Sequence, residues 1–163
     1  HQRVRRQRQM CIRDRGDYAI KTEKKGFIIF GRSDSTLNPG GIRIGTAEIY
    51  RAVEKLDEVN ESIVVGQEWN NDVRIILFVT LKEKIDLNDE LVSRIKENIK
   101  SSTSIRHVPA KIIHVNDIPR TRSGKIAELT VRDIINGEKV KNIEALANPS
   151  CLSDYENIEE LDY

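Results

Sequence analysis

The sequence predicts an α+β fold, in which a small three-stranded sheet is flanked by helices and preceded by a β-hairpin. Three observations predict it. Apolar segments at 18–21 and 26–30 are joined by a polar connection, later apolar segments have the length of strands, and other stretches repeat apolar residues every three or four positions. At 163 residues the chain is long enough for one domain with a hydrophobic core.

The sheet strands are predicted at 62–66, 73–81 and 111–115. Residues 73–81 are apolar almost throughout, which favours the central position in the sheet. Polar residues at 68–72 predict the turn that joins the first two sheet strands.

Amphipathic periodicity predicts three helices. The first begins at Thr46, which we expect to cap it; the second spans 86–102, and the third spans 129–136 and ends at Gly137. The pair Asn148-Pro149 is typical of the start of a further short helix.

Composition excludes several classes of function. The net charge is +1, and no apolar run approaches the roughly 20 residues of a membrane span, so we expect no membrane partner. Cys11 and Cys151 are isolated from one another, which indicates reduced thiols in a cytosolic protein. His107 and His114 are also isolated, and the sequence therefore assigns no metal ligand.

After the leading hairpin the chain turns sharply. Pro39 restricts the backbone, while Gly40 and Gly41 open it and let a ligand come close. The guanidinium groups of Arg32 and Arg43 offer a fixed fork of donors that suits phosphate and ribose oxygens. The residues alone leave two interpretations open, a nucleotide-facing loop or a solvated surface turn.

This stretch contains Ser-Asp-Ser-Thr-Leu-Asn and Gly-Ile-Arg-Ile-Gly-Thr-Ala-Glu-Ile-Tyr-Arg-Ala-Val. It resembles the hinge motif of the acyl-adenylate-forming enzymes, which include acyl-CoA synthetases, luciferases and the adenylation domains of peptide synthetases. The resemblance runs from about Gly16 to about Pro149. Within the family the chain is most similar to the acetoacetate–CoA ligases, whose tail resembles residues 140–149. The resemblance implies a ligase that uses Mg-ATP and CoA as co-substrates and proceeds through an acyl-AMP.

In the first half-reaction of this family a carboxylate attacks ATP. The resemblance implies that Asp17 accepts hydrogen bonds from the ribose hydroxyls and that Arg32 and Arg43 hold nucleotide oxygens. In the second half-reaction the thiol of CoA displaces AMP. The resemblance implies that the small domain first rotates about a hinge at Asp34.

The same resemblance assigns the CoA side of the site. Gly40 and Gly41 would line the channel for the pantetheine arm, and Lys100 would contact the 3′-phosphate of CoA. For Lys100, a solvated helix surface is the open alternative.

Lys125 ends the motif Pro-Arg-Thr-Arg-Ser-Gly-Lys, which resembles the last motif of the family. A nucleotide phosphate loop does not fit, because Pro119 stands where its first glycine belongs and Ile126 where its magnesium-binding hydroxyl belongs. The resemblance implies that Lys125 is the catalytic cation of the first half-reaction. If this motif stood alone, it would be interpreted as a solvated basic loop.

The resemblance also divides the chain. Residues 16–33 would end an N-terminal domain, 34–147 would form the C-terminal domain, and 148–163 would be an acidic tail. Residues 1–15 contain six arginines and precede the family-like sequence abruptly, which indicates a non-native lead-in. An Arg-rich arm can also bind nucleic acid, which we expect to be an unlikely partner.

The chain contains no counterpart of the large N-terminal domain with its acyl pocket. We therefore expect the chain alone to be inactive and to need that domain, with acetoacetate, ATP and CoA as substrates and the cytoplasm as location. Three alternatives stay open: a fragment of a ligase for acetate or another short-chain acid, a nucleic-acid-binding module, and an interaction or carrier-docking fragment.

Overall fold

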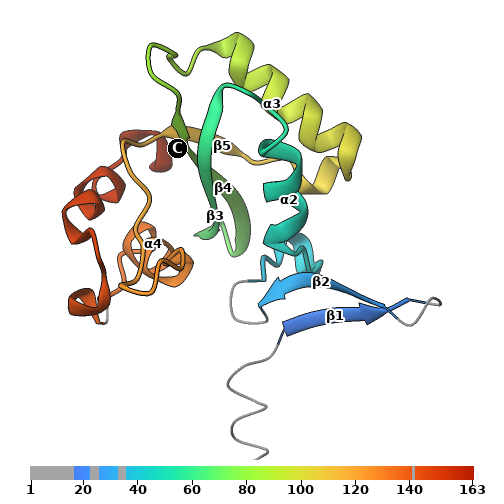
Figure 1. The fold of residues 1–163 in the computed structure, drawn as a ribbon, viewed down its shortest axis with the longest axis horizontal. Helices are drawn as coiled ribbons and strands as arrows, with labels where there is room; N and C mark the ends of the chain where they lie inside the picture. Colours follow the sequence, from blue (N-terminus) through green and yellow to red (C-terminus); the bar gives the residue numbers. More distant parts are fainter. Residues whose placement is uncertain (1–16, 23–25, 33–35, 141) are drawn as a thin grey trace, which may run out of the picture.

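The computed structural model describes residues 17–22, 26–32, 36–140 and 142–163. As predicted, a two-stranded hairpin precedes a three-stranded sheet (Figure 1). β1 (Asp17–Lys21) and β2 (Phe27–Arg32) pair in antiparallel fashion, and Asp17 lies opposite Arg32 in the register.

The main sheet consists of β3 (Val59–Trp69), β4 (Asp72–Leu81) and β5 (Lys111–His114), in the order β3-β4-β5. β4 pairs antiparallel with β3 and parallel with β5, so the prediction that it is the central strand is confirmed. Its side chains alternate between the two faces of the sheet and are buried on both, which explains why its sequence is apolar almost throughout.

The turn between β3 and β4 is shorter than predicted. The strands continue to Trp69 and begin again at Asp72, so only Asn70 and Asn71 connect them. Both asparagines have positive φ, 49° and 62°, as a two-residue hairpin turn of the type I′ class requires. The prediction of a turn over 68–72 was wrong because asparagine tolerates this backbone conformation and lets the ladder extend to the turn.

The three predicted helices are α2 (Thr46–Val53), α3 (Asp89–Ser102) and α4 (Glu128–Ile135). Thr46 does not cap α2: Gly45 is the N-cap and Thr46 is the buried first residue of the helix. α3 begins later than predicted because the Asn88 side chain accepts a hydrogen bond from the Leu91 amide and so caps it. Five short 3₁₀ helices complete the described elements: Pro39–Gly41, Ile105–His107, Ile143–Ala145, Pro149–Tyr155 and Glu159–Leu161.

Different elements cover the two faces of the sheet. α2 and α3 pack on one face, against Leu77 and its neighbours, while α4 and the C-terminal 3₁₀ helices pack on the other, against Phe78 (Figure 1). None of the described helices is both long and apolar enough to cross a membrane.

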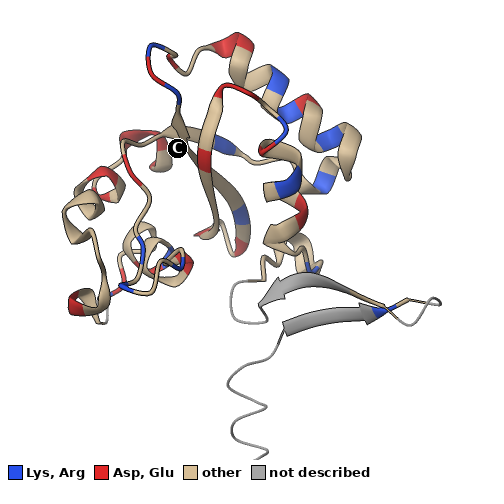
Figure 2. Ribbon diagram, viewed as in Figure 1, with Lys and Arg blue, Asp and Glu red and all other residues tan. Residues whose placement is uncertain are grey.

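The acidic tail is part of the core. Tyr155 is only 1% exposed, meets Phe78 edge-on with ring centroids 4.9 Å apart, and donates a hydrogen bond to the Asp117 carbonyl at 2.9 Å. The Arg74 guanidinium donates to the carbonyls of Leu161 and Tyr163 at 2.6 and 3.0 Å. The acidic positions of this segment, marked red along the ribbon in Figure 2, are exposed or half-buried, while apolar residues between them are buried.

Side chains close the outer edge of β3, beside which the described part of the chain places no further strand. The hydroxyl of Tyr50 on α2 accepts from the Val64 amide at 3.1 Å and donates to Glu128 Oε1 at 2.5 Å. Asn136, directly after α4, accepts from the Glu68 amide at 2.7 Å and donates to the Gly66 carbonyl at 3.2 Å. These contacts satisfy backbone groups that an uncovered edge strand would expose.

We predict that Tyr50→Phe lowers the free energy of unfolding by about 1–3 kcal/mol, because the Val64 amide loses its acceptor. Chemical denaturation of residues 16–163 measures the change. The matched control is Tyr163→Phe, whose side chain is 68% exposed, and this variant should unfold like the original chain. Equal stability of the two variants would contradict the assigned role of Tyr50.

Because of the same hydroxyl, we expect the stability of the domain to depend on pH in the alkaline range. Burial, and secondarily the Glu128 carboxylate, raises the pKa of Tyr50 well above its ordinary value. A raised pKa means that this stabilisation is complete below the ordinary tyrosine pKa of about 10 and is lost as the pH rises further. Above pH 10, the free energy of unfolding should therefore fall less steeply with pH for Tyr50→Phe than for the original chain. Chemical denaturation at a series of pH values measures both.

Candidate functional site

The first candidate loop is the glycine corner, which we define as Pro39–Gly41. Its base is an antiparallel bridge between Leu37 and Ile44, with N–H···O distances of 3.0 and 2.9 Å. Gly40 and Gly41 have φ values of 56° and 75°, which glycine adopts readily. The predicted sharp turn at these two glycines is therefore confirmed. Arg43 is exposed on the same loop.

A carboxylate from the sheet holds this corner. Asp72 accepts the Gly40 N–H with both oxygens, at 2.9 and 3.0 Å, and its Oδ1 also accepts the Val73 N–H at 2.8 Å. These backbone hydrogen bonds lower the pKa of Asp72 below its ordinary value, because they favour the ionised form.

The second candidate loop carries Lys125. A bridge between Arg120 and Ile126 closes it, and the Thr121 amide donates to the Lys125 carbonyl at 2.8 Å. Thr121 Oγ1 accepts the Lys125 amide at 3.1 Å. The side chain of Lys125 is exposed and has no hydrogen bond or ion pair to the described part of the chain. The loop thus fixes the backbone and leaves one cation facing solvent.

This loop is braced from two sides. The Arg120 guanidinium donates to the Gly124 carbonyl at 2.9 Å and pairs with Glu61 on β3. On the other side, Asn148 accepts the Arg120 amide at 2.8 Å and donates to the Ile118 carbonyl at 2.9 Å. Tertiary contacts therefore hold the loop in place before any ligand arrives.

The two loops are anchored at opposite ends of the β3–β4 hairpin. Asp72 pairs with Trp69 at the turn, whereas Glu61 pairs with Thr80 near the other end. Glu61 and Trp69 are eight positions apart along β3, which is about 26 Å at the rise of a strand. The structure therefore brings Gly40, Gly41 and Arg43 together in one loop and places the anchor of the Lys125 loop elsewhere.

The remaining predicted site residues belong to other segments of the chain. Lys100 is exposed in the last turn of α3, with its Nζ 3.9 Å from Glu97 Oε2. Asp17 and Arg32 face each other in the β1–β2 register, where only the backbone is described. The predicted hinge, Asp34, lies outside the described residues, as do residues 1–15 with their arginines.

His107 and the buried Cys151 have contacts or burial that belong to the fold. His107 joins Ser104 to Glu48 on α2, with Nδ1···Oγ and Nε2···Oε2 distances of 2.9 and 2.7 Å. Burial raises the pKa of the Cys151 thiol to about 11, so it keeps its proton at neutral pH. Within the described ranges no cluster of three His, Cys, Asp or Glu side chains could hold a metal.

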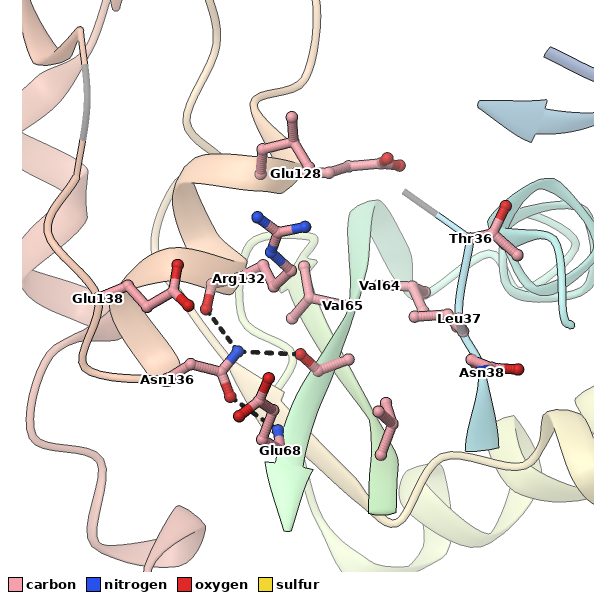
Figure 3. A pocket seen from close by; sticks show the side chains of 13 residues that line it. Thr36, Leu37, Asn38, Val64, Val65, Glu68, Glu128, Arg132, Asn136 and Glu138 are labelled. Carbon is pink, nitrogen blue, oxygen red and sulfur yellow. Dashed lines mark hydrogen bonds between the residues drawn. The ribbon is translucent and has the colours of Figure 1, made fainter. Parts of the chain in front are cut away.

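A cavity of about 320 Å³ lies between residues 36–38, β3 and α4 (Figure 3). Glu128, Arg132 and Asn136 contribute polar groups from α4 and the residue that follows it. Among the predicted site residues whose side chains are described, none lines this cavity. It therefore lies between α4 and the segment that follows the predicted hinge. The described candidates for catalysis and binding lie outside it.

Sequence reasoning missed the residues that position both loops. Asp72 was included in a longer turn, and the partners Arg120 and Glu61 are 59 positions apart in the sequence. A stricter use of the Asn-Asn turn signal would have placed Asp72 at the start of β4. No local signal pairs Arg120 with Glu61.

Comparisons with known proteins find relatives of this chain in sequence and in fold. Residues 48–125 match the family model described as AMP-binding enzyme C-terminal domain. A relative from Rhizobium meliloti (strain 1021), acetoacetyl-coenzyme A synthetase, is 58% identical over 90% of this chain and 22% of its own length. Acetoacetyl-CoA synthetase from Xenopus tropicalis is 45% identical, with the same two coverages.

A solved structure, acetoacetyl-CoA synthetase from Streptomyces lividans, superposes with a TM-score of 0.78 at 39% identity, over 90% of this chain and 22% of that one. The fold class predicted from the sequence is therefore confirmed by a related solved structure as well. The chain spans 22% of the length of these relatives.

We predict that Thr121→Val loosens the Lys125 loop without unfolding the domain. The Lys125 amide loses its acceptor, so its hydrogen exchange should accelerate about 5- to 10-fold. Exchange measured by NMR at single amides tests this, with Thr130→Val on α4 as the control. If both variants exchange at the original rate, the hydroxyl of Thr121 does not hold the loop.

Proposed function

Because residues 48–125 belong to the AMP-binding enzyme C-terminal domain family, we propose that this chain is the C-terminal part of an ATP-dependent acetoacetate–CoA ligase. The observation that carries the proposal is the exposed Lys125, whose ammonium pairs with no described residue, on a braced loop anchored at the opposite end of one hairpin from the glycine corner. The 58% identity to a synthetase with this printed name supports acetoacetate as the acid.

In the first half-reaction, the acid attacks the α-phosphorus of Mg-ATP and forms acyl-AMP and pyrophosphate. Lys125 lies between the carboxylate and the phosphate, orients both, and offsets the negative charge that develops there. One oriented donor of this kind contributes about 3–4 kcal/mol to the transition state. Arg32 and Arg43 hold nucleotide oxygens, and Asp17 accepts the ribose hydroxyls.

In the second half-reaction, the domain turns about Asp34, so that Lys125 leaves and the glycine corner reaches the site. Gly40 and Gly41 line the path of the pantetheine arm, and the Lys100 ammonium meets the 3′-phosphate of CoA. The surroundings of the corner support this assignment, because a Cβ built at Gly40 or Gly41 meets no atom of the described residues within 4 Å. The corner is therefore open to a ligand on the side where a side chain would project.

The proposal includes a division of the chain. Residues 16–33 end the N-terminal domain, residues 34–147 form the C-terminal domain, and residues 148–163 are a tail that packs on it. Selection of the acid belongs to an N-terminal domain that the chain requires as a partner, and the whole ligase works in the cytoplasm. Supplying that domain and comparing acetoacetate with acetate and other short-chain acids tests the choice of substrate.

The chain alone should have no ligase activity, because its residues supply one cation and one loop but no acyl pocket. ATP–pyrophosphate exchange with acetoacetate is the assay. Exchange above the protein-free background would contradict this prediction.

The roles of the two loops are separable in a fused ligase, defined as the Rhizobium meliloti synthetase with residues 16–163 in place of its matching C-terminal region. Lys125→Ala should lower acyl-AMP formation about 10²- to 10³-fold, the typical loss when one transition-state donor is removed. Thioester formation from supplied acyl-AMP and CoA should change less than about threefold, because Lys125 has left the site in that step.

Lys139→Ala is the matched control, since Lys139 is also exposed and follows α4 outside both loops. Both half-reactions should persist in this variant. If both also persist in Lys125→Ala, Lys125 is a surface lysine and the proposed mechanism fails.

A further inference from the structure

We propose that Asp72 is a positioning residue for the second half-reaction: its carboxylate fixes the glycine corner in the conformation that admits the arm of CoA. The inference rests on the proposed function and adds a residue to it. Asp72 lies in neither candidate loop and reaches the corner from the sheet.

The β3–β4 turn places this carboxylate accurately. Asn70 and Asn71 form the whole connection, and Trp69 pairs directly with Asp72. A two-residue turn sets the register of both strands, so Asp72 is fixed as the first residue of β4. The sheet therefore holds the Asp72 carboxylate, which is the acceptor, in a fixed position.

The hydrogen bonds of the corner show what Asp72 adds. The amides of Gly41 and Ile42 donate within the loop, to the carbonyls of Asn38 and Pro39 at 3.4 and 3.1 Å. The Gly40 amide instead donates out of the loop, to both oxygens of Asp72. This amide is therefore the point at which the tip of the corner is tied to the sheet.

Packing cannot replace this tie. Leu37 and Ile44 bury the base of the loop, at 4% and 2% exposure, but a Cβ at Gly40 or Gly41 would meet no atom of the described residues within 4 Å. Two consecutive glycines in left-handed conformations have many alternatives of similar energy. Without the carboxylate, the base of the loop keeps its place while the tip takes up other conformations.

The corner is also the part that must present backbone to a ligand. Gly41 and Asp72 line one shallow hollow together with the β3–β4 turn. An ionised carboxylate that holds the Gly40 amide fixes the peptide plane between Pro39 and Gly40, and with it the wall of the proposed pantetheine channel. Asp72 acts through Gly40 and does not itself touch the reacting atoms.

Asp72→Asn in the fused ligase tests the inference. The amide nitrogen of asparagine would face the Gly40 N–H, donor against donor, and its one oxygen would have to serve both Gly40 and Val73. Thioester formation from supplied acyl-AMP should fall about 10- to 100-fold, with a raised KM for CoA, because a charge-assisted hydrogen bond is lost. Acyl-AMP formation should stay within about twofold, since the corner is away from the site in that step.

Two further variants sharpen the result. Asp72→Glu keeps the charge but moves the acceptor outward, and should lower thioester formation less than Asp72→Asn does, again without affecting acyl-AMP formation. Asp86→Asn, at an exposed aspartate before α3, should leave both half-reactions unchanged.

The outcomes separate this inference from the proposed function. If the unsubstituted fused ligase performs both half-reactions and Asp72→Asn changes neither, or lowers both equally, Asp72 is not a positioning residue for CoA and the proposed function stands. If the unsubstituted fused ligase forms neither acyl-AMP nor thioester, the proposed function fails and the inference with it.

Discussion

The β3–β4 hairpin is the constraint on which the rest of the domain depends. Asp72 at its turn ties down the glycine corner, and Glu61 near its other end braces the loop of Lys125. A strand cannot shorten, so the two anchors keep a separation of about 26 Å along β3. Under the proposed function, a small reacting centre would meet only one of these loops at a time, which is why we propose that the whole domain turns between the two half-reactions.

The hairpin can hold this spacing because its side chains are packed and backbone groups at its open edge are hydrogen-bonded. β4 is buried on both faces, and Tyr50 and Asn136 fill the open edge of β3. The C-terminal segment, bound by Arg74, covers the face that α2 and α3 leave free. The glycine corner and the loop of Lys125 thus lie at the two ends of a hairpin that is itself packed on both faces.

The sequence predicted those features that depend on local pattern. The apolar run of β4 indicated a central strand, and two adjacent glycines indicated a sharp turn, which the structure forms with positive φ at both. The sequence did not predict the features that depend on tertiary contacts. Nothing local shows that the acidic segment around Tyr155 belongs to the core, or that Arg120 meets a carboxylate 59 positions away. Asp72 was missed for a narrower reason, because the Asn-Asn pair was taken as part of a longer turn and not as a complete one.

The proposed division of labour between the loops can be observed directly in the fused ligase. Spin labels at Ser123, beside Lys125, and at Ile42, beside the glycine corner, would each be paired with one fixed label in the N-terminal domain. Pulsed dipolar spectroscopy would measure both distances, first with ATP and acetoacetate and then with a stable acyl-AMP analogue and CoA. We expect the distance to Ser123 to lengthen and the distance to Ile42 to shorten between the two states. Distances that stay constant, or that change in the same direction, would contradict the account.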